Sequence, residues 1–221
     1  MNIIGLGKAG CAIADSFSQY PQYNIYKIDT DLDDDFDFIE KYEETQTVKK
    51  SYKIKVQPGP EAYEANTPSF KAFFRGLKGE SLFVVGGSGN ISAMCLRIIE
   101  QIRNKSKIDV LYVKPDIFML NQTDAKHEKV TYNVLQHYAR SAAVNAVLLV
   151  SNSQLESILG EVPIIGYYDK LNELLVSTIH MINVFKNSEP VMGGLTSVDE
   201  ESTRRIYTVG IFDIEKGEEK L

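Results

Sequence analysis

The chain has 221 residues, 43% of them hydrophobic and 24% charged, with a net charge of −6. Its length suits one α/β domain, or one domain with an appendage, and its composition is that of a folded globular protein rather than a disordered one. The acidic balance argues against a nucleic-acid partner, while two cysteines and the lack of a basic leader or a bilayer-length apolar segment lead us to expect a cytosolic protein outside the membrane.

Short apolar runs alternate with helical patterns along most of the chain, which predicts a doubly wound α/β fold with a mostly parallel sheet and Rossmann-like topology. The predicted strands are Asn2–Gly5, Asn24–Asp29, Tyr52–Val56, Leu82–Gly86, Asp109–Val113, Ala146–Ser151 and Arg205–Asp213. The predicted helices are Gly10–Gln19, Phe70–Leu77, Ile91–Arg103, Lys126–Ala142 and the long central helix Gly166–Phe185. We expect the acidic stretch Asp29–Glu44 to be a solvated, partly helical connection, and Gln57–Pro68 to be an irregular loop because of its prolines.

The first glycine-rich turn follows the first predicted strand and leads into a helix. Gly5, Gly7 and Gly10 have the spacing of the dinucleotide-binding fingerprint, and Asp29 stands about where an NAD-binding fold carries its ribose-binding acid. Such a turn presents backbone N–H groups and the positive end of a helix dipole, so we expect phosphate to bind there. Taken alone, this turn favours NAD, and a tight turn that binds nothing is the alternative.

A second glycine-rich turn, Gly86-Gly87-Ser88-Gly89-Asn90, also follows a predicted strand and precedes a helix. A single NAD site would not explain it, because one helix N-terminus already takes the pyrophosphate. Two cradles suit a triphosphate held from both sides. Ser88, Asn90 and Ser92 can donate side-chain hydrogen bonds in addition to the amides of Gly87 to Asn90, and a simple small-residue helix start is the alternative.

The order of these segments resembles the tubulin/FtsZ family of GTPases. The first turn, Asp29-Thr30-Asp31, the loop Pro58–Pro68 and the second turn look like successive nucleotide loops of that family. Further along, Val150–Leu155 resembles its strand-end asparagine segment, and Tyr168–Ser177 is similar to the start of tubulin's long central helix. The resemblance covers about Met1 to Phe185 and depends on the order of the motifs rather than on any one of them.

This resemblance implies GTP or GDP as the ligand, with Mg²⁺ held by phosphate oxygens and by Thr30 or Asp31. It implies base contacts from Asn152, Tyr168 and Asn172, with Asp169 as the base-reading residue in an FtsZ-like register. None of the three histidines has a second ligand at metal spacing, so we predict no metal site made of protein ligands alone. The implied phosphate contacts are Gly7, Lys8, Ala9, Gly10, Cys11, Gly86, Gly87, Ser88, Gly89 and Asn90.

The two asparagines also suit guanine on chemical grounds. Guanine offers both donors and acceptors on one edge, and an amide side chain has both, so Asn152 and Asn172 are candidates to read that edge. Tyr168 lies one helical turn before Asn172, which allows its ring to stack on the base. A local cap or turn is the alternative use of each asparagine.

Departures from the family pattern concern hydrolysis and assembly. Ser88 stands where the family has Thr, Ile91 where it has a glycine, and Lys8 where tubulin has a Gln near the phosphates. The family's acidic pattern after the long helix is missing, which leaves Glu189 as the nearest candidate catalytic acid, with 199–201 further on. We therefore expect slow hydrolysis at best.

The sequence thus predicts a nucleotide-binding domain over residues 1–188 and a short extension over 189–221 with one strand. The shortened C-terminal part argues against filaments, and protein partners or self-association stay open. Two other interpretations are kept: an NAD-binding oxidoreductase or sensor, and a nucleotide-free structural or interaction module derived from the tubulin fold.

Overall fold

The computed structural model describes residues 1–32, 36–42, 45–160, 163–189 and 205–209. The strands are β1 (Asn2–Leu6), β2 (Asn24–Asp29), β3 (Phe36–Tyr42), β4 (Thr45–Lys53), β5 (Gly79–Gly86), β6 (Ser106–Lys114), β7 (Ala146–Ser151) and β8 (Ile206–Thr208). The α-helices are α1 (Gly7–Phe17), α2 (Pro60–Ala65), α3 (Cys95–Ile102), α4 (Gln122–Arg140), α5 (Asn152–Leu159) and α6 (Tyr167–Asn187), and the 3₁₀ helices are η1 (Asn90–Met94) and η2 (Ile117–Met119).

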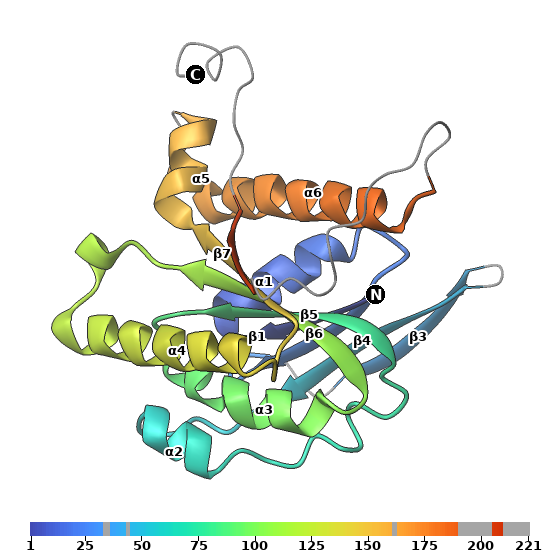
Figure 1. Cartoon of the computed structure of the whole chain (residues 1–221), viewed down its shortest axis with the longest axis horizontal. Helices are drawn as coiled ribbons and strands as arrows, with labels where there is room; N and C mark the ends of the chain where they lie inside the picture. Colours follow the sequence, from blue (N-terminus) through green and yellow to red (C-terminus); the bar gives the residue numbers. More distant parts are fainter. Residues whose placement is uncertain (33–35, 43–44, 161–162, 190–204, 210–221) are drawn as a thin grey trace.

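The described strands form one eight-stranded sheet in the order β3-β4-β2-β1-β5-β6-β7-β8 (Figure 1). All neighbouring pairs are parallel except β3 and β4, which are antiparallel. The chain builds outward from β1 on one side and then returns to place β5 on the other side of β1. This confirms the predicted doubly wound, mostly parallel sheet.

Helices cover both faces of the sheet, α1 and α6 on one and α3 and α4 on the other (Figure 1). Successive strand residues point to opposite faces, so Ile3 packs with the α1 and α6 side chains and Ile4 with those of α3. Both faces of the central strands are therefore buried, and Leu82–Val85 of β5 is at most 1% exposed. This double cover explains why the central strands read as continuous apolar runs rather than as alternating patterns.

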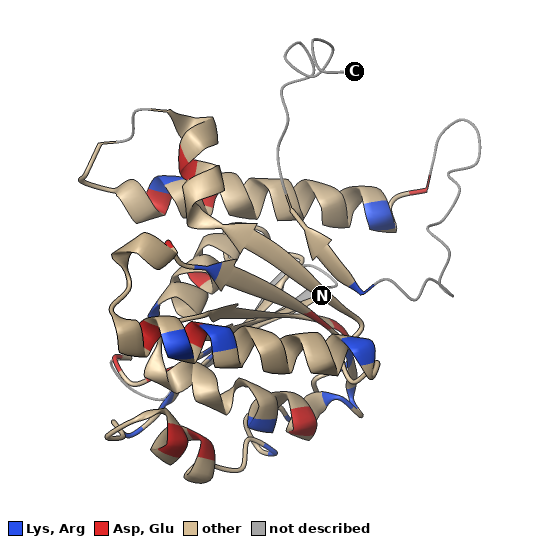
Figure 2. Ribbon diagram, turned by 60° about the vertical axis from the view of Figure 1, so that its left-hand side comes forward, with Lys and Arg blue, Asp and Glu red and all other residues tan. Residues whose placement is uncertain are grey.

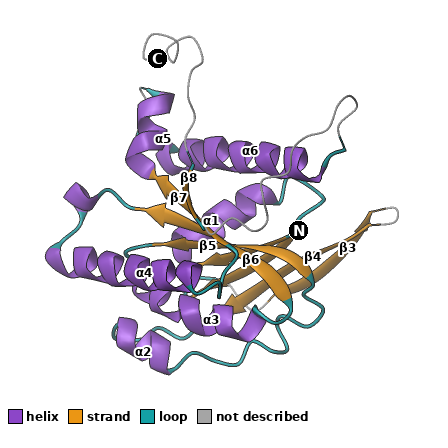
Figure 3. Ribbon diagram, in the orientation of Figure 1, coloured by secondary structure: helices purple, strands orange, loops and turns teal. Residues whose placement is uncertain are grey.

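The structure corrects the prediction for Asp29–Glu44. Phe36–Tyr42 is strand β3, which pairs with β4 in an antiparallel hairpin at the sheet edge (Figure 3), so the expected partly helical connection was wrong. The predicted strand Tyr52–Val56 overlaps only the end of β4. Most of the residues described in β4 are half-buried, so the strand can contain several lysines. Its sequence therefore lacks the alternation of apolar and polar residues by which a strand is predicted.

Two further segments differ from the prediction. The expected irregular loop contains the short helix α2, whose first residue is Pro60, a position where proline's missing N–H costs no helical hydrogen bond. The predicted helix Phe70–Leu77 consists of turns, and buried Phe70 and Phe74 belong to an aromatic cluster with Tyr26 and Tyr52. Tertiary burial of these rings outweighs their helical spacing.

The end of the chain is described only in part. β8 pairs in parallel with β7, while residues 210–213 of the predicted strand Arg205–Asp213 and the acidic residues 199–201 lie outside the described residues. The division at residue 188 therefore stays a prediction. In the described part of the chain, no helix combines the length and apolar character needed to cross a membrane.

Candidate functional site

The two glycine-rich turns meet at the point where the sheet order reverses. β1 and β5 are parallel neighbours, with Leu6 opposite Val85 in register, so the turns that follow them leave the sheet side by side. The first turn leads to α1 on one face and the second to η1 and α3 on the other (Figure 1). Open α/β sheets bind ligands in the crevice at the carboxyl ends of the strands where the order reverses.

The glycines of the first turn allow α1 to approach the sheet closely. A Cβ on Gly5 would overlap the carbonyl oxygen of Gly10, and a Cβ on Gly10 would lie 2.6 Å from the carbonyl oxygen of Val84. Gly7 has φ +71°, a left-handed conformation that side chains disfavour. Close packing at Gly5 and Gly10 and the left-handed conformation of Gly7 are therefore enough to require glycine at these positions, whether or not the turn binds a ligand.

The N-terminus of α1 is free of competing groups from its own sequence. Its N-cap is Leu6, which provides no side-chain hydrogen bond, and its first turn contains no acidic residue. The start of a helix leaves the N–H groups of Gly7, Lys8 and Ala9 without helical partners. Lys8 and Ala9 are exposed. This end of α1 can therefore accept an anion.

Cys11, four residues into α1, turns its side chain inward. The thiol lies 3.5 Å from the carbonyl oxygen of Gly5 and 3.6 Å from that of Ile28, and its single proton can be donated to either. Burial, with the charge of Asp29 as a smaller cause, raises the pKa of the Cys11 thiol to about 12. Any phosphate contact of Cys11 would be through its backbone, and it stays a prediction.

In the second turn, part of the backbone is already engaged. The N–H of Gly87 donates to the carbonyl oxygen of Val113 at 3.2 Å, so this amide is not available to an anion as the sequence suggested. The hydroxyl of Ser92 donates to the carbonyl oxygen of Gly86 at 2.6 Å. By contrast, the N–H groups of Ser88, Gly89 and Asn90 make no hydrogen bond with another described residue. The turn thus retains three adjacent donors.

Tyr112 and Glu128 pack against Gly87 of the second turn, and the sequence analysis missed both. A Cβ on Gly87 would overlap the hydroxyl oxygen of Tyr112 and lie 3.0 Å from Cγ of Glu128. The Tyr112 hydroxyl donates to Oε1 of the buried Glu128 at 3.1 Å, and its ring stacks on Tyr132. Burial and the nearby Glu128 carboxylate raise the pKa of Tyr112. No local motif marks such a contact between a strand and a helix 16 residues later.

Ile91 fills the space between the two turns. It is 8% exposed, and its Cγ2 lies 2.7 Å from where a Cβ on Gly7 would be. Ala9 approaches Gly86 in the same region, 3.6 Å from a Cβ built there. The turns are therefore in contact, and Ile91, which stands where the family has a glycine, lies directly beside Gly7 of the first turn.

The end of β2 lies beside the first turn because β1 and β2 are neighbours. Asp29 is 8% exposed and its Oδ1 accepts the N–H of Thr30 at 2.8 Å. Burial raises the pKa of the Asp29 carboxyl, while the hydrogen bond from Thr30 and, to a lesser extent, the charge of Lys8 lower it. Thr30 is half-buried and Asp31 exposed. No group of three or more candidate metal ligands occurs among the described residues.

The loop before α2 lies beside the second turn. Pro58, Gly59 and Asn90 line an open cleft of about 560 Å³, together with residues at the start of α4. The sequence placed this loop among the nucleotide loops, and the structure brings it next to Asn90.

The candidate base contacts lie on α5 and α6, which pack together on the face occupied by α1. Asn152 and Asn172 are half-buried, and neither side-chain amide has a hydrogen-bond partner among the described residues. Neither asparagine occupies an N-cap position, which is held by Ser151 in α5 and by Gly166 in α6. The structure therefore gives neither of them an N-capping role. Tyr168 is 68% exposed and Asp169 is also exposed, both in the first turn of α6.

Glu189 is remote from these groups. It is exposed and lies two residues after the end of α6. The C-terminal part of α6 contacts the amino ends of the strands, with Nδ1 of His180 2.9 Å from the Tyr23 hydroxyl and Nζ of Lys186 3.5 Å from Oε1 of Glu80. The 21 residues of α6 span about 30 Å. Glu189 therefore cannot serve the glycine-rich turns of its own chain.

Comparisons with known proteins support the fold. No protein-family model and no curated protein sequence match the chain. Among solved structures, an empty FtsZ dimer from M. jannaschii matches with a TM-score of 0.63 and 13% identity over 87% of this chain and 56% of that one. TubZ of Bacillus thuringiensis serovar israelensis matches in a GTPγS-form protofilament (TM-score 0.59, 14% identity, 85% of this chain and 57% of that one) and in GDP-form protofilaments (0.59, 15%, 86% and 56%).

The chain spans little more than half the length of these structures. At 13–15% identity, the similarity concerns the fold alone. The chain therefore has a divergent tubulin/FtsZ-like fold.

Proposed function

We propose that this chain binds GTP or GDP with Mg²⁺ at the sheet reversal, hydrolyses GTP slowly at best and does not form filaments. The main support is the meeting of two glycine-rich turns from β1 and β5 at one point of the sheet. The similar TubZ structures are GTPγS-form and GDP-form protofilaments, which makes a guanine nucleotide the first ligand to test.

The phosphates would be held from two sides. The N–H groups of Gly7, Lys8 and Ala9 at the start of α1 supply one side, and those of Ser88, Gly89 and Asn90 supply the other. The Lys8 ammonium adds positive charge to an otherwise neutral helix start. Four further residues are expected to shape the cradle: Gly10, Cys11, Gly86 and Gly87. The thiol of Cys11 points inward and the N–H of Gly87 donates to Val113. A Cβ on Gly10 would overlap the backbone of β5, and one on Gly86 would contact Ala9.

The residues near the cradle fit Mg²⁺. Thr30 and Asp31 follow β2, the neighbour of β1, and provide the oxygen ligands that Mg²⁺ prefers. Few protein ligands suit this ion, because it usually keeps several waters and takes phosphate oxygens. When bound, Mg²⁺ neutralises charge on the phosphates. Asp29 is less suited to this role because its carboxylate already accepts the Thr30 N–H.

The base would lie between α5 and α6. The amide groups of Asn152 and Asn172 have no partner within the described part of the chain and suit the guanine edge, and Tyr168 is exposed enough to stack on the ring. In an FtsZ-like register, Asp169 would take the reading role instead. Slow hydrolysis follows from the position of Glu189, which can act only on the nucleotide of another chain.

A second candidate is supported by Ile91. Its side chain packs against Gly7 and narrows the space between the two turns. If that space is too narrow for phosphate, the chain is a nucleotide-free interaction module with the same fold.

Titration calorimetry with GTP, GDP, ATP and NAD in the presence of Mg²⁺ tests the proposal. GTP and GDP should bind more tightly than ATP, because adenine reverses the donor and acceptor order and an unmatched buried polar pair costs about 1–3 kcal/mol. Equal binding of ATP and GTP, or saturable NAD binding alone, would contradict the guanine assignment. Absence of binding by all four would favour the nucleotide-free module.

Two variants separate the ends of the ligand. Ser88→Ala should weaken GTP binding more than guanosine binding, whereas Asn172→Ala should weaken both alike. Circular dichroism serves as the folding control. Unchanged GTP affinity in folded Ser88→Ala would mean that the second turn is only a packing feature.

A further inference from the structure

The β3–β4 hairpin forms one edge of the sheet and extends past its neighbour β2. β4 pairs with β2 only over Lys49–Lys53, whereas β3 pairs with β4 along the whole of Phe36–Tyr42. Beyond Lys49 the hairpin is therefore a two-stranded ribbon among the described strands, and Figure 1 shows it projecting from the edge of the sheet. Two strands alone are marginally stable in water, and three or more are usually needed. This ribbon would be stabilised by a further strand.

The outer edge of β3 has no other strand beside it in the described part of the chain. Such an edge is a template for pairing with another chain, and proteins commonly protect it by shortening the strand, bulging it or placing proline there. β8, the described strand at the opposite edge, has only three residues. β3 has seven, contains no proline and pairs with β4 residue by residue without a bulge. Of the two edges, β3 is therefore the one suited to pairing.

The register determines which residues of β3 offer backbone groups to a further strand. Only two residues separate the paired Tyr42 and Thr45, so this pair exchanges both of its backbone hydrogen bonds. Hydrogen-bonded residues alternate along an antiparallel pair, and Asp37, Ile39 and Lys41 therefore direct their N–H and C=O groups away from β4. The outer edge thus presents three donors and three acceptors.

The sequence of this edge is complementary to itself. If two copies of β3 pair antiparallel about a twofold axis at Ile39, Asp37 stands opposite Lys41 of the second copy, and Lys41 stands opposite its Asp37. All outward backbone groups then meet a partner, because both strands direct the same three positions to the shared edge. Ile39 stands opposite its own copy, and Val48 is its partner in β4 on both sides. Opposite charges and apolar pairs across strands each contribute about 0.2–1 kcal/mol.

We propose that two copies of this chain associate through antiparallel pairing of β3 to form one continuous sheet. The contact is isologous and closes at two copies, so it does not lead to a filament. Edge-to-edge pairing leaves the helix layers in water, which suits α3 and α4 because both carry acidic and basic residues (Figure 2). β4 and β2 separate this edge from the sheet reversal, so the dimer does not require a nucleotide.

Sedimentation velocity of the full chain without nucleotide tests the association. The net charge of −6 and the acids before and after β3 in the sequence make two copies repel each other. Salt at 0.15 M screens charges more than about 8 Å apart, while the facing pairs persist. The mass should rise from 24.8 kDa towards twice that value as the concentration increases from about 1 to 200 µM. A chain that remains monomeric at the highest concentration would overturn the proposal.

Charge reversals test the register. Asp37→Lys and Lys41→Asp each place like charges opposite each other at two positions of the dimer and should weaken it about tenfold or more. An equal mixture of the two variants restores both opposite-charge pairs and should associate like the unaltered chain, which also shows that neither variant has lost the hairpin. Glu40→Lys makes the same change of charge opposite Phe38 of the second copy and should weaken the dimer less than about threefold. A mixture no tighter than the single variants, or equal weakening by Glu40→Lys, would refute the proposed pairing.

Hydrogen exchange provides an independent readout of the same contact. The amides of Asp37, Ile39 and Lys41 should exchange more slowly as the concentration of the chain rises, whereas those of Phe38 and Glu40, which already bond to β4, should change little. Unchanged exchange at the three outer amides in a chain that sediments as a dimer would place the contact elsewhere and overturn the proposal.

Discussion

Gly87→Ala tests whether the second glycine-rich turn is as tightly supported as the structure indicates. The new methyl group would overlap the Tyr112 hydroxyl and lie 2.9 Å from Cζ of that ring and 3.0 Å from Cγ of Glu128. Tyr112 cannot retreat easily, because it is fully buried and hydrogen-bonded to Glu128. Overpacking of this kind typically costs about 1–3 kcal/mol.

Gly89→Ala is the matched control, because the same atoms are added two residues along the same turn. Its Cβ would lie 3.5 Å from Oγ of Ser92, an ordinary contact, and its φ of −75° suits alanine. We expect it to be neutral, or to stabilise the fold by about 0.4–1 kcal/mol through the unfolded state. Urea and thermal unfolding should therefore separate the two variants, by about 2–4 °C for each kcal/mol in a chain of this size.

Tyr112→Phe identifies the cause of the Gly87→Ala effect. Alone it leaves the buried Glu128 carboxylate without the Tyr112 donor and should cost about 1–3 kcal/mol. Combined with Gly87→Ala, it removes the atom nearest the new methyl group, so the double variant should be less destabilised than the sum of the two single variants. Equal stability of Gly87→Ala and Gly89→Ala, or strict additivity in the double variant, would refute the close packing of Tyr112 under the turn.

Three further predictions address the site. Ile91→Ala should destabilise the fold by about 2–5 kcal/mol because Ile91 is buried. Calorimetry on the folded variant should nevertheless show tighter GTP binding, because the space beside Gly7 widens. Unchanged or weaker binding would show that Ile91 does not limit the approach of phosphate. Asp29→Asn should stabilise the fold more at neutral pH than at pH 4. Burial raises the pKa of Asp29 in the folded chain, so the wild-type chain loses stability as the pH rises through the pKa of the folded state. The Thr30 N–H retains an acceptor in the variant, and an increase in melting temperature that does not depend on pH would contradict the prediction. Phosphate release per chain should be slow and independent of protein concentration, with no GTP-dependent light scattering; a rate that climbs with concentration and is lost in Glu189→Ala would show assembly with catalysis between chains.

The sequence by itself determined the features that depend on neighbouring residues. The run from β1 through Gly5, Gly7 and Gly10 into α1 is one such feature, because a strand, a positive-φ turn and a helix start are all encoded within ten residues. The length of α6 is another, since its apolar spacing continues without interruption. The alternation of such units was enough to predict a doubly wound sheet before any contact was known.

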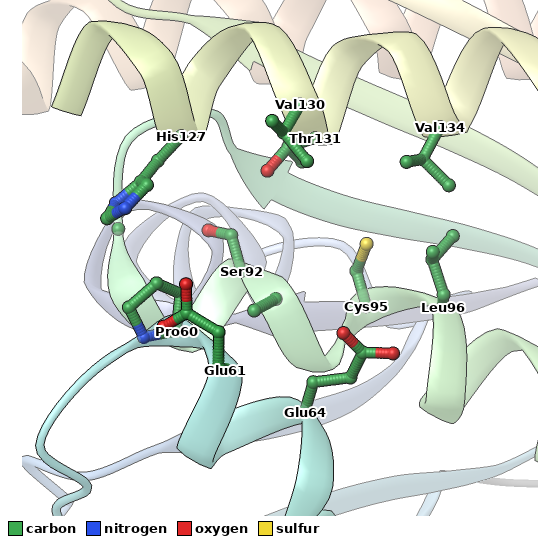
Figure 4. A pocket seen from close by; sticks show the side chains of 12 residues that line it. Pro60, Glu61, Glu64, Ser92, Cys95, Leu96, His127, Val130, Thr131 and Val134 are labelled. Carbon is green, nitrogen blue, oxygen red and sulfur yellow. The ribbon is translucent and has the colours of Figure 1, made fainter. Parts of the chain in front are cut away.

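Only the tertiary structure decided the features that join distant segments. β4 pairs with β2 on one side and with β3 on the other, and its sequence lacks the apolar alternation by which a strand is predicted. Gly87 gives its N–H to Val113 and packs on Tyr112, which removes one expected phosphate donor from the second turn. Nδ1 of His127 (Figure 4) is buried without a hydrogen-bond partner among the described residues, which also depends on how distant segments pack. Hydrogen-bond satisfaction and burial are set by atoms that are far apart along the chain, so no local pattern records them.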